Sequence, residues 1–320
     1  MKKLGKIDTI TKEYMKDPVI FADMFNKFLY HGRQVIRPES LIEMDSTEIV
    51  VPYGEGKAGV PAQKYRDVLK LMKTDGNIAY CILGCEDQGA IHYAMPVKNM
   101  LYDSMQFARQ VTKAAKSHRQ EKEHKPTSDE FLSGFYKTDR LIPVVTLVIY
   151  WGPDRWDGPL TLKEMYAEAD DAVMQYVPDY KINLIAPEQM SDDEIKEFQT
   201  SLKEVMLYIK YSKDKNKLQK VTQADESFQN LDRQAAEVIN VTTNSKLKYP
   251  EGKEKIDMCL ALEEMRMDSK REGIREGEIK GAVETYQEVG ISLQETSRRV
   301  SVKFNLPLQL AEDKVKKYWK

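Results

Sequence analysis

Residues 143–152, with the sequence PVVTLVIYWG, are apolar at almost every position. A strand with one face in water alternates apolar and polar residues, whereas a continuous apolar run is typical of a strand buried on both faces. Such a strand needs helices on each side of its sheet. Amphipathic spacing predicts helices over residues 17–31 and 96–118, and YKINLI at 180–185 predicts a further strand. The chain is therefore predicted to adopt an α/β fold.

Two further strand-like segments, residues 65–73 and 78–85, are separated by an Asp-Gly pair at positions 75 and 76. Asp-Gly between apolar strands favours a hairpin with a type I′ turn, because both central residues need positive φ. A two-residue loop would place Asp67 opposite Gly84. Side chains alternate along a strand, so Asp67, Glu86 and Gln88 would share one face of the sheet. A slip of one residue would instead separate the two acids.

Asp67 and Glu86 are the acidic pair in this predicted hairpin that could hold a metal ion. Mg²⁺ favours carboxylate oxygens and keeps several waters, so two acids at adjacent strand ends can bind it. A metal there would polarise a phosphate oxygen and activate a water. Gln88 is placed to orient that water. Acids at strand ends also occur as capping or solvated groups, and that alternative stays open.

The predicted helix over residues 96–118 carries a basic stripe. Residues 109–125 contain six basic and two acidic residues, although the net charge of the whole chain is only −2. Any phosphate-binding surface must therefore be local, and a solvated helix face is the alternative. The candidates for DNA-backbone contacts are Gln106, Arg109, Lys113 and Lys116. The stripe expected to pack on the sheet comprises Val97, Leu101, Met105, Ala108, Val111 and Ala115.

Several of these features together resemble the PD-(D/E)XK nuclease superfamily. They are Asp67, the strand that ends in Glu86-x-Gln88, and the following helix with Tyr102 and Gln106. More narrowly, the chain is similar to the recombination-promoting nuclease branch, whose members are also named as transposases. The segments that carry this similarity fall within roughly residues 15–215 and read FADMFNKFLYHGRQVI, IHYAMPVKNMLYDSMQFARQV, FLSGFYKTDRLIPVVTLVIYWG and VPDYKINLI.

The resemblance implies a restriction-endonuclease-like core, a central mixed sheet flanked by helices, with a C-terminal helical extension. It implies a DNA endonuclease that hydrolyses phosphodiester bonds in double-stranded DNA with Mg²⁺ or Mn²⁺. Asp67 and Glu86 would be the metal ligands, and Gln88 stands where the general motif has lysine. Glutamine carries no positive charge, so the alternative is a catalytically weak or inactive DNA-binding or assembly protein that retains the nuclease fold.

The predicted domain organisation is a nuclease-like domain over residues 1–212, a polar connector over 213–253 and a helical arm over 254–320. Glycine is costly inside a helix, so Gly273, Gly277 and Gly281 suggest close approach of a partner helix and a homodimer formed through the arm. A regulatory appendage, an exposed tail and a DNA-reading helix-turn-helix are the alternatives for this arm. Arg298, Arg299, Lys303, Lys314, Lys316 and Lys317 would serve the last of these.

The expected compartment is the cytoplasm. Three cysteines are too few for a disulfide framework and favour a reducing environment. No apolar run reaches the ~18–20 residues needed to span a bilayer, so no membrane partner is expected.

Overall fold

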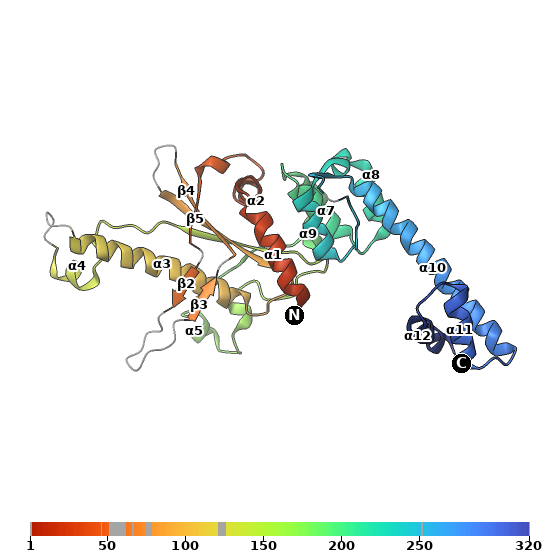
Figure 1. The fold of residues 1–320 in the computed structure, drawn as a ribbon. Coiled ribbons are helices and arrows are strands. Elements are labelled where there is room, and N and C mark those ends of the chain that lie inside the picture. Colours follow the sequence, from red (N-terminus) through yellow and green to blue (C-terminus); the bar gives the residue numbers. More distant parts are fainter. Residues whose placement is uncertain are drawn as a thin grey trace. The chain divides into compact units, whose positions relative to one another are not determined.

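The computed structural model describes residues 2–45, 47–50, 62–65, 67–74, 79–120, 126–250 and 252–319. The chain divides into two compact units (Figure 1). The first unit comprises Met1–Ser245 with Gly252–Met258, and the second comprises Lys246–Glu251 with Cys259–Lys320. Each unit is described separately below.

The first unit is built on a five-stranded mixed sheet with strand order β1-β4-β5-β6-β7. The pairs β1–β4 and β4–β5 are antiparallel, whereas β5–β6 and β6–β7 are parallel. This mixed sheet with its flanking helices confirms the predicted α/β class. The strands are Leu41–Glu43 (β1), Val68–Lys73 (β4), Ala79–Gln88 (β5), Val144–Tyr150 (β6) and Asn183–Ile185 (β7).

Helices cover both faces of β6, as its continuous apolar sequence requires. On one face, Thr146 of β6 donates a hydrogen bond of 2.6 Å to Asp103 of α3 (Met95–Gln120). On the other face, the rings of Trp151 and Tyr14 of α1 (Lys2–Lys16) have centroids 6.5 Å apart. The sheet is therefore the middle layer of three.

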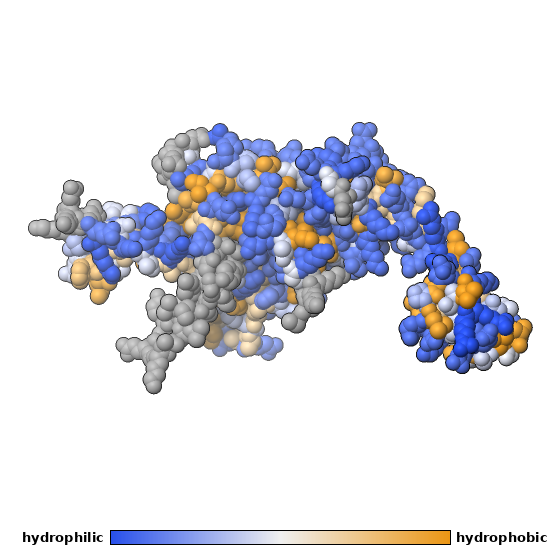
Figure 2. Space-filling view, in the orientation of Figure 1, coloured by the Kyte–Doolittle hydropathy of each residue, from blue (hydrophilic) through white to orange (hydrophobic). Residues whose placement is uncertain are grey.

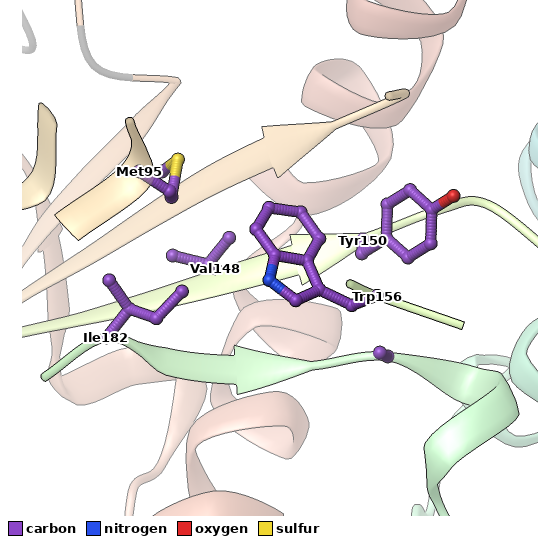
Figure 3. Close-up of a cluster of buried hydrophobic side chains, with 6 residues drawn as sticks. Met95, Val148, Tyr150, Trp156 and Ile182 are labelled. Carbon is purple, nitrogen blue, oxygen red and sulfur yellow. The ribbon is translucent and has the colours of Figure 1, made fainter. Parts of the chain in front are cut away.

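The first turn of α3 is anchored by an apolar cluster beside β6 and β7 (Figure 3). Trp156 contributes its ring, which lies edge-on to Tyr150 with centroids 5.4 Å apart. This packing holds the beginning of α3 against the sheet. The cluster comprises Met95, Val148, Tyr150, Trp156, Ile182 and Ala186.

The face of α3 that packs on the sheet differs from the predicted one. Val97, from the expected apolar stripe, is exposed, while Asn99, Asp103 and Gln106 are buried. Both Oδ atoms of Asp103 accept hydrogen bonds, from Thr146 and from Tyr180. Because the buried carboxylate of Asp103 finds partners across the interface, a polar residue occupies the inner face of α3, and the hydrophobic pattern misidentifies that face.

The region expected to be a polar connector, residues 213–253, is instead largely part of the first unit. It forms α8 (Lys215–Ala224) and α9 (Arg233–Thr243), and β8 (Leu231–Asp232) pairs with β9 (Lys255–Ile256). The inner face of α9 packs against α1 and α7 (Leu202–Tyr211). The buried residues of this face are Ala235, Ala236, Val238 and Ile239. They form only a short apolar patch within a polar stretch, so the sequence pattern does not reveal the helix.

The remaining elements of the first unit are short, apart from α2 (Pro18–Tyr30), whose N-cap Asp17 accepts a hydrogen bond from the backbone of Val19. Ser191 caps α6 (Asp192–Lys196), which is separate from α7. The others are β2 (Thr47–Val50), β3 (Ala62–Tyr65), α4 (Ser128–Ser133), α5 (Asp171–Met174) and the 3₁₀ turns Pro38–Ser40, Lys163–Met165, Pro187–Gln189 and Glu226–Asn230.

The second unit is a small helical module. It contains most of α10 (Met258–Glu288), together with α11 (Leu293–Lys303) and α12 (Leu308–Tyr318), within the predicted helical arm. Gly290, with φ of 76°, ends α10, and Ser292 caps α11 through the backbone nitrogen of Glu295. The module has its own core of Ile279, Val283, Val300, Ala311 and Val315.

No described helix is both long enough and apolar enough to cross a membrane. The surface over the outer part of α3 is largely hydrophilic, whereas hydrophobic residues gather at α4 (Figure 2). Phe131 and Leu132 of α4 are almost fully exposed.

Candidate active site

The register of the β4–β5 hairpin brings Asp67 to the end of β5 that carries Glu86. Val68 pairs with Cys85 and Leu69 with Gly84, so the predicted pairing of Asp67 with Gly84 is wrong by two residues. An irregularity between Met72 and Lys73 accompanies this shift, and the predicted turn residues 75 and 76 lie outside the described part of the chain. A two-residue shift preserves the alternation of side chains. The ladder ends at Val68 and Cys85, and Asp67 directly precedes β4, where its carboxylate reaches the backbone of Asp87, the residue after Glu86.

The carboxylate of Asp67 is held against β5 by the backbone. Its Oδ2 accepts a hydrogen bond of 2.9 Å from the nitrogen of Asp87. Burial raises the pKa of Asp67, while this hydrogen bond and the charges of Lys98 and Lys12 oppose the rise. Asp67 also lines a cavity of about 500 Å³ together with Lys12 and Lys16 of α1 and Glu43 and Asp45. The acid is therefore fixed in position at the edge of an open space.

Glu86 points to the α3 side of the sheet and is fully buried. Its Oε2 lies 2.9 Å from Nζ of Lys98, which belongs to the first turns of α3. Burial alone would lower the pKa of Lys98, but the attraction of Glu86 outweighs it and the pKa rises. The ammonium also lies 5.7 Å from the ring centroid of Tyr102. Glu86 and Lys98 therefore form a charged pair inside the protein.

Asp87, between Glu86 and Gln88, lies on the opposite side of β5. Its Oδ1 accepts a hydrogen bond of 2.9 Å from Nε1 of Trp151 and is 3.8 Å from Sγ of Cys85. Burial, followed by the charge of Asp67, raises the pKa of Asp87 well above its ordinary value. The side chain of Asp87 therefore has a structural role in bonding Trp151, and its backbone nitrogen positions Asp67.

Gln88 is 9% exposed and its side chain folds back on its own strand. Its Nε2 donates a hydrogen bond of 2.9 Å to the carbonyl of Asp87. The residue shares a face with Glu86 as expected from alternation, but its amide donor is engaged within β5. Orientation of a water by Gln88 remains a prediction that would use the other amide atom.

Three side chains that the sequence analysis did not assign to the site lie around it: Asp8, Asp87 and Lys98. Asp8 of α1 approaches Gly89, where an added Cβ would lie 3.6 Å from its Oδ1. Burial raises the pKa of Asp8, and the charge of Lys98 opposes that rise. The sequence held one signal for Lys98. Asn99, Asp103 and Gln106 recur at helical spacing and mark the face of α3 that lies toward the sheet, next to Lys98.

The candidate DNA-contacting residues of α3 fall into two groups. Arg109, Lys113 and Lys116 are exposed on the helix. Gln106 is 1% exposed and belongs to the face that packs on the sheet, so the structure does not offer it to a phosphate. The prediction grouped Gln106 with the basic stripe because the assumed inner face of α3 was incorrect.

The donor chemistry of the site suits a hard divalent cation, because Asp67 and Glu86 supply carboxylate oxygens from neighbouring strands. Within the described ranges, no group of three or more Asp, Glu, His or Cys residues could hold a metal ion. A cation bound here would therefore take the rest of its ligands from water or substrate, as Mg²⁺ commonly does.

Comparison with known proteins is consistent with this architecture. No curated protein and no solved structure matched the chain. Residues 62–238 match the model of a family described as "Putative transposase, YhgA-like". The match covers more than half of the chain and includes β4, β5, α3 and β6. The protein therefore belongs to the YhgA-like family of transposase-related proteins.

Proposed function

We propose that the protein is a divalent-metal-dependent DNA endonuclease of the PD-(D/E)XK type that hydrolyses phosphodiester bonds. The observation that carries the proposal is the hydrogen bond that holds the Asp67 carboxylate on the backbone of Asp87, the residue after Glu86, with the cation of Lys98 beside Glu86. The family match supports a nuclease-like or transposase-related role. Double-stranded DNA in the cytoplasm is the proposed substrate.

In this proposal Asp67 and Glu86 would hold Mg²⁺ or Mn²⁺. When bound, the metal supplies Lewis acidity toward a phosphate oxygen and lowers the pKa of a water. The chain's own groups hold these side chains in place. The backbone nitrogen of Asp87 donates a hydrogen bond to Asp67, and α3 carries Lys98, which pairs with Glu86. The cavity beside Asp67 offers room for a phosphate, with Lys12 and Lys16 in its wall.

The basic residues of α3 provide the proposed contact with DNA backbone. Arg109, Lys113 and Lys116 lie at intervals of four and three positions, so they follow one side of the helix. Contacts of this kind release counterions and position a duplex without reading its sequence.

A second candidate is a DNA-binding or assembly protein that keeps the fold and has lost efficient turnover. The observation that favours it is the engagement of the Gln88 amide with its own strand, at the position where the general motif has a charged lysine. Such a protein would bind metal and DNA but cleave the DNA slowly or not at all.

Supercoiled plasmid incubated with Mg²⁺, Mn²⁺ or EDTA distinguishes these candidates. The endonuclease is expected to convert plasmid to nicked and linear forms with either metal. Cleavage should disappear in EDTA and in the Asp67→Ala variant. Retained DNA binding with no metal-dependent nicking would support the second candidate.

A further inference from the structure

The buried ion pair between Lys98 and Glu86 occupies the position at which the proposed function needs a metal ion. Nζ of Lys98 is 2.9 Å from Oε2 of Glu86, whose side chain is fully buried. We propose that Lys98 is a built-in counter-ion of Glu86, which a divalent cation must displace or share, so that Lys98 sets the metal affinity of the site. This inference rests on the proposed function and concerns the regulation of the same site.

The burial of Glu86 explains why the fold needs a cation there. A buried carboxylate is costly unless an opposite charge or hydrogen bonds compensate it. Lys98 supplies that charge from α3, and it is held in place because Met95, one turn earlier, is anchored in the apolar cluster beside β6. The ring of Tyr102 further confines the ammonium. The positive charge is therefore part of the folded framework.

The charge of Lys98 acts on more than one group of the site. It opposes the rise in pKa of both Asp67 and Asp8, and it lowers the pKa of His92. A cation that approaches Asp67 and Glu86 is repelled by the ammonium while it is attracted by the two carboxylates. At the effective dielectric of a protein, such repulsion over a few ångströms is strong enough to lower the affinity for a cation by about tenfold or more. Lys98 should therefore weaken metal binding substantially.

Three variants of the full-length chain test this proposal. Lys98→Met keeps much of the apolar stem and removes the charge, whereas Lys98→Arg keeps a charge on the same helix. Lys220→Met is the matched control, because Lys220 is an exposed lysine on another helix, α8. Mn²⁺ is the probe: its free concentration is followed by electron paramagnetic resonance, and its effect on thermal unfolding is measured in parallel.

We expect Lys98→Met to bind Mn²⁺ at least about tenfold more tightly than the wild type, because the competing cation is gone. Mn²⁺ should also raise its Tm by more than it raises that of the wild type, since the metal replaces the lost counter-charge. Lys98→Arg and Lys220→Met should behave like the wild type. If Lys98→Met does not fold in EDTA, refolding in Mn²⁺ should rescue it.

The double variant Glu86→Gln, Lys98→Met assigns the effect to this site, because it should lose the gain in affinity. Equal Mn²⁺ affinity in the wild type and Lys98→Met, or failure of Mn²⁺ to rescue an unfolded variant, would overturn the role of Lys98 alone. Absence of Mn²⁺ binding in every variant would overturn the proposed metal site itself. The two failures are therefore distinguishable.

Discussion

Oδ2 of Asp67 accepts a hydrogen bond of 2.9 Å from the backbone nitrogen of Asp87. This contact joins the residue before β4 to the end of β5, one position beyond Glu86. It gives Asp67 two separable roles. The acceptor oxygen closes the hairpin end, and the negative charge is available for a cation.

Substitutions of Asp67 should separate these two roles. Asp67→Asn retains an oxygen that can accept from Asp87, so urea unfolding should show stability close to that of the wild type. Asp67→Ala leaves the partly buried backbone donor without this acceptor and should lose about 1–2 kcal/mol of unfolding free energy. Both variants should lose metal-dependent cleavage by orders of magnitude. An active Asp67→Asn would show that the charge is dispensable.

Arg109, Lys113 and Lys116 are expected to contact phosphates in the DNA complex. Replacing all three by alanine should flatten the slope of log affinity against log salt by roughly 0.9 for each contact that is lost. Fluorescence anisotropy with a labelled duplex between low and physiological salt measures this slope. The matched control replaces three exposed lysines of α8: Lys215, Lys217 and Lys220. An unchanged slope in the α3 variant would mean that its stripe is only solvated.

Asp87 should make the stability of the metal-free protein fall as pH rises. Burial and the charge of Asp67 raise its pKa in the folded state, whereas the unfolded chain titrates near the ordinary value of 3.8. Between these values the folded state binds more protons, so unfolding free energy decreases with pH, by at most about 1.4 kcal/mol per pH unit for one proton. Asp87→Asn keeps an acceptor for Trp151 and removes the titration.

Urea unfolding in EDTA at pH 5 and pH 8 tests this expectation. The Asp87→Asn variant should have a flatter pH dependence and greater relative stability at pH 8. Identical pH dependences in the two proteins would show that Asp87 does not retain its proton in the folded state.

The C-terminal helical module is proposed to form a homodimer. An added Cβ at Gly273, Gly277 or Gly281 would meet no described atom within 4 Å, so no packing within the described chain accounts for these glycines. Light scattering at micromolar concentration should give a dimer for the full chain and a monomer for a chain that ends at Met258. Gly277→Leu should weaken the dimer, while the neighbouring exposed change Glu278→Leu should not. A monomeric full chain would refute the proposal.

Much of the fold was predictable where one kind of periodicity dominates. The buried strand β6 and the helix α2 match their predicted segments closely, and the C-terminal module is helical, as predicted for the arm. The hairpin register was missed because it depends on an irregularity between Met72 and Lys73, which the strand pattern does not reveal. The inner face of α3 was missed because Asp103 is satisfied by Thr146 and Tyr180, far away in the sequence.

The same limits apply to the candidate site. Alternation along β5 placed Glu86 and Gln88 on one face, whereas the register of the hairpin differs by two residues from the predicted one, and a site shared by Asp67 and Glu86 stays a prediction. Lys98 could not be assigned from its spacing, since its contact with Glu86 depends on how α3 is seated on the sheet. Long-range packing therefore decides which charged residues complete the site.

The most direct test of the central claim is cleavage of a labelled DNA duplex under single-turnover conditions with Mg²⁺. The wild type and the exposed control Glu39→Gln should cleave at similar rates and stop in EDTA. Glu86→Gln should be slower by orders of magnitude, because the proposed charge stabilisation is delivered by the ion it binds. Gln88→Ala should lose less than Asp67→Ala. Metal-dependent cleavage by Glu86→Gln at the wild-type rate would contradict the account.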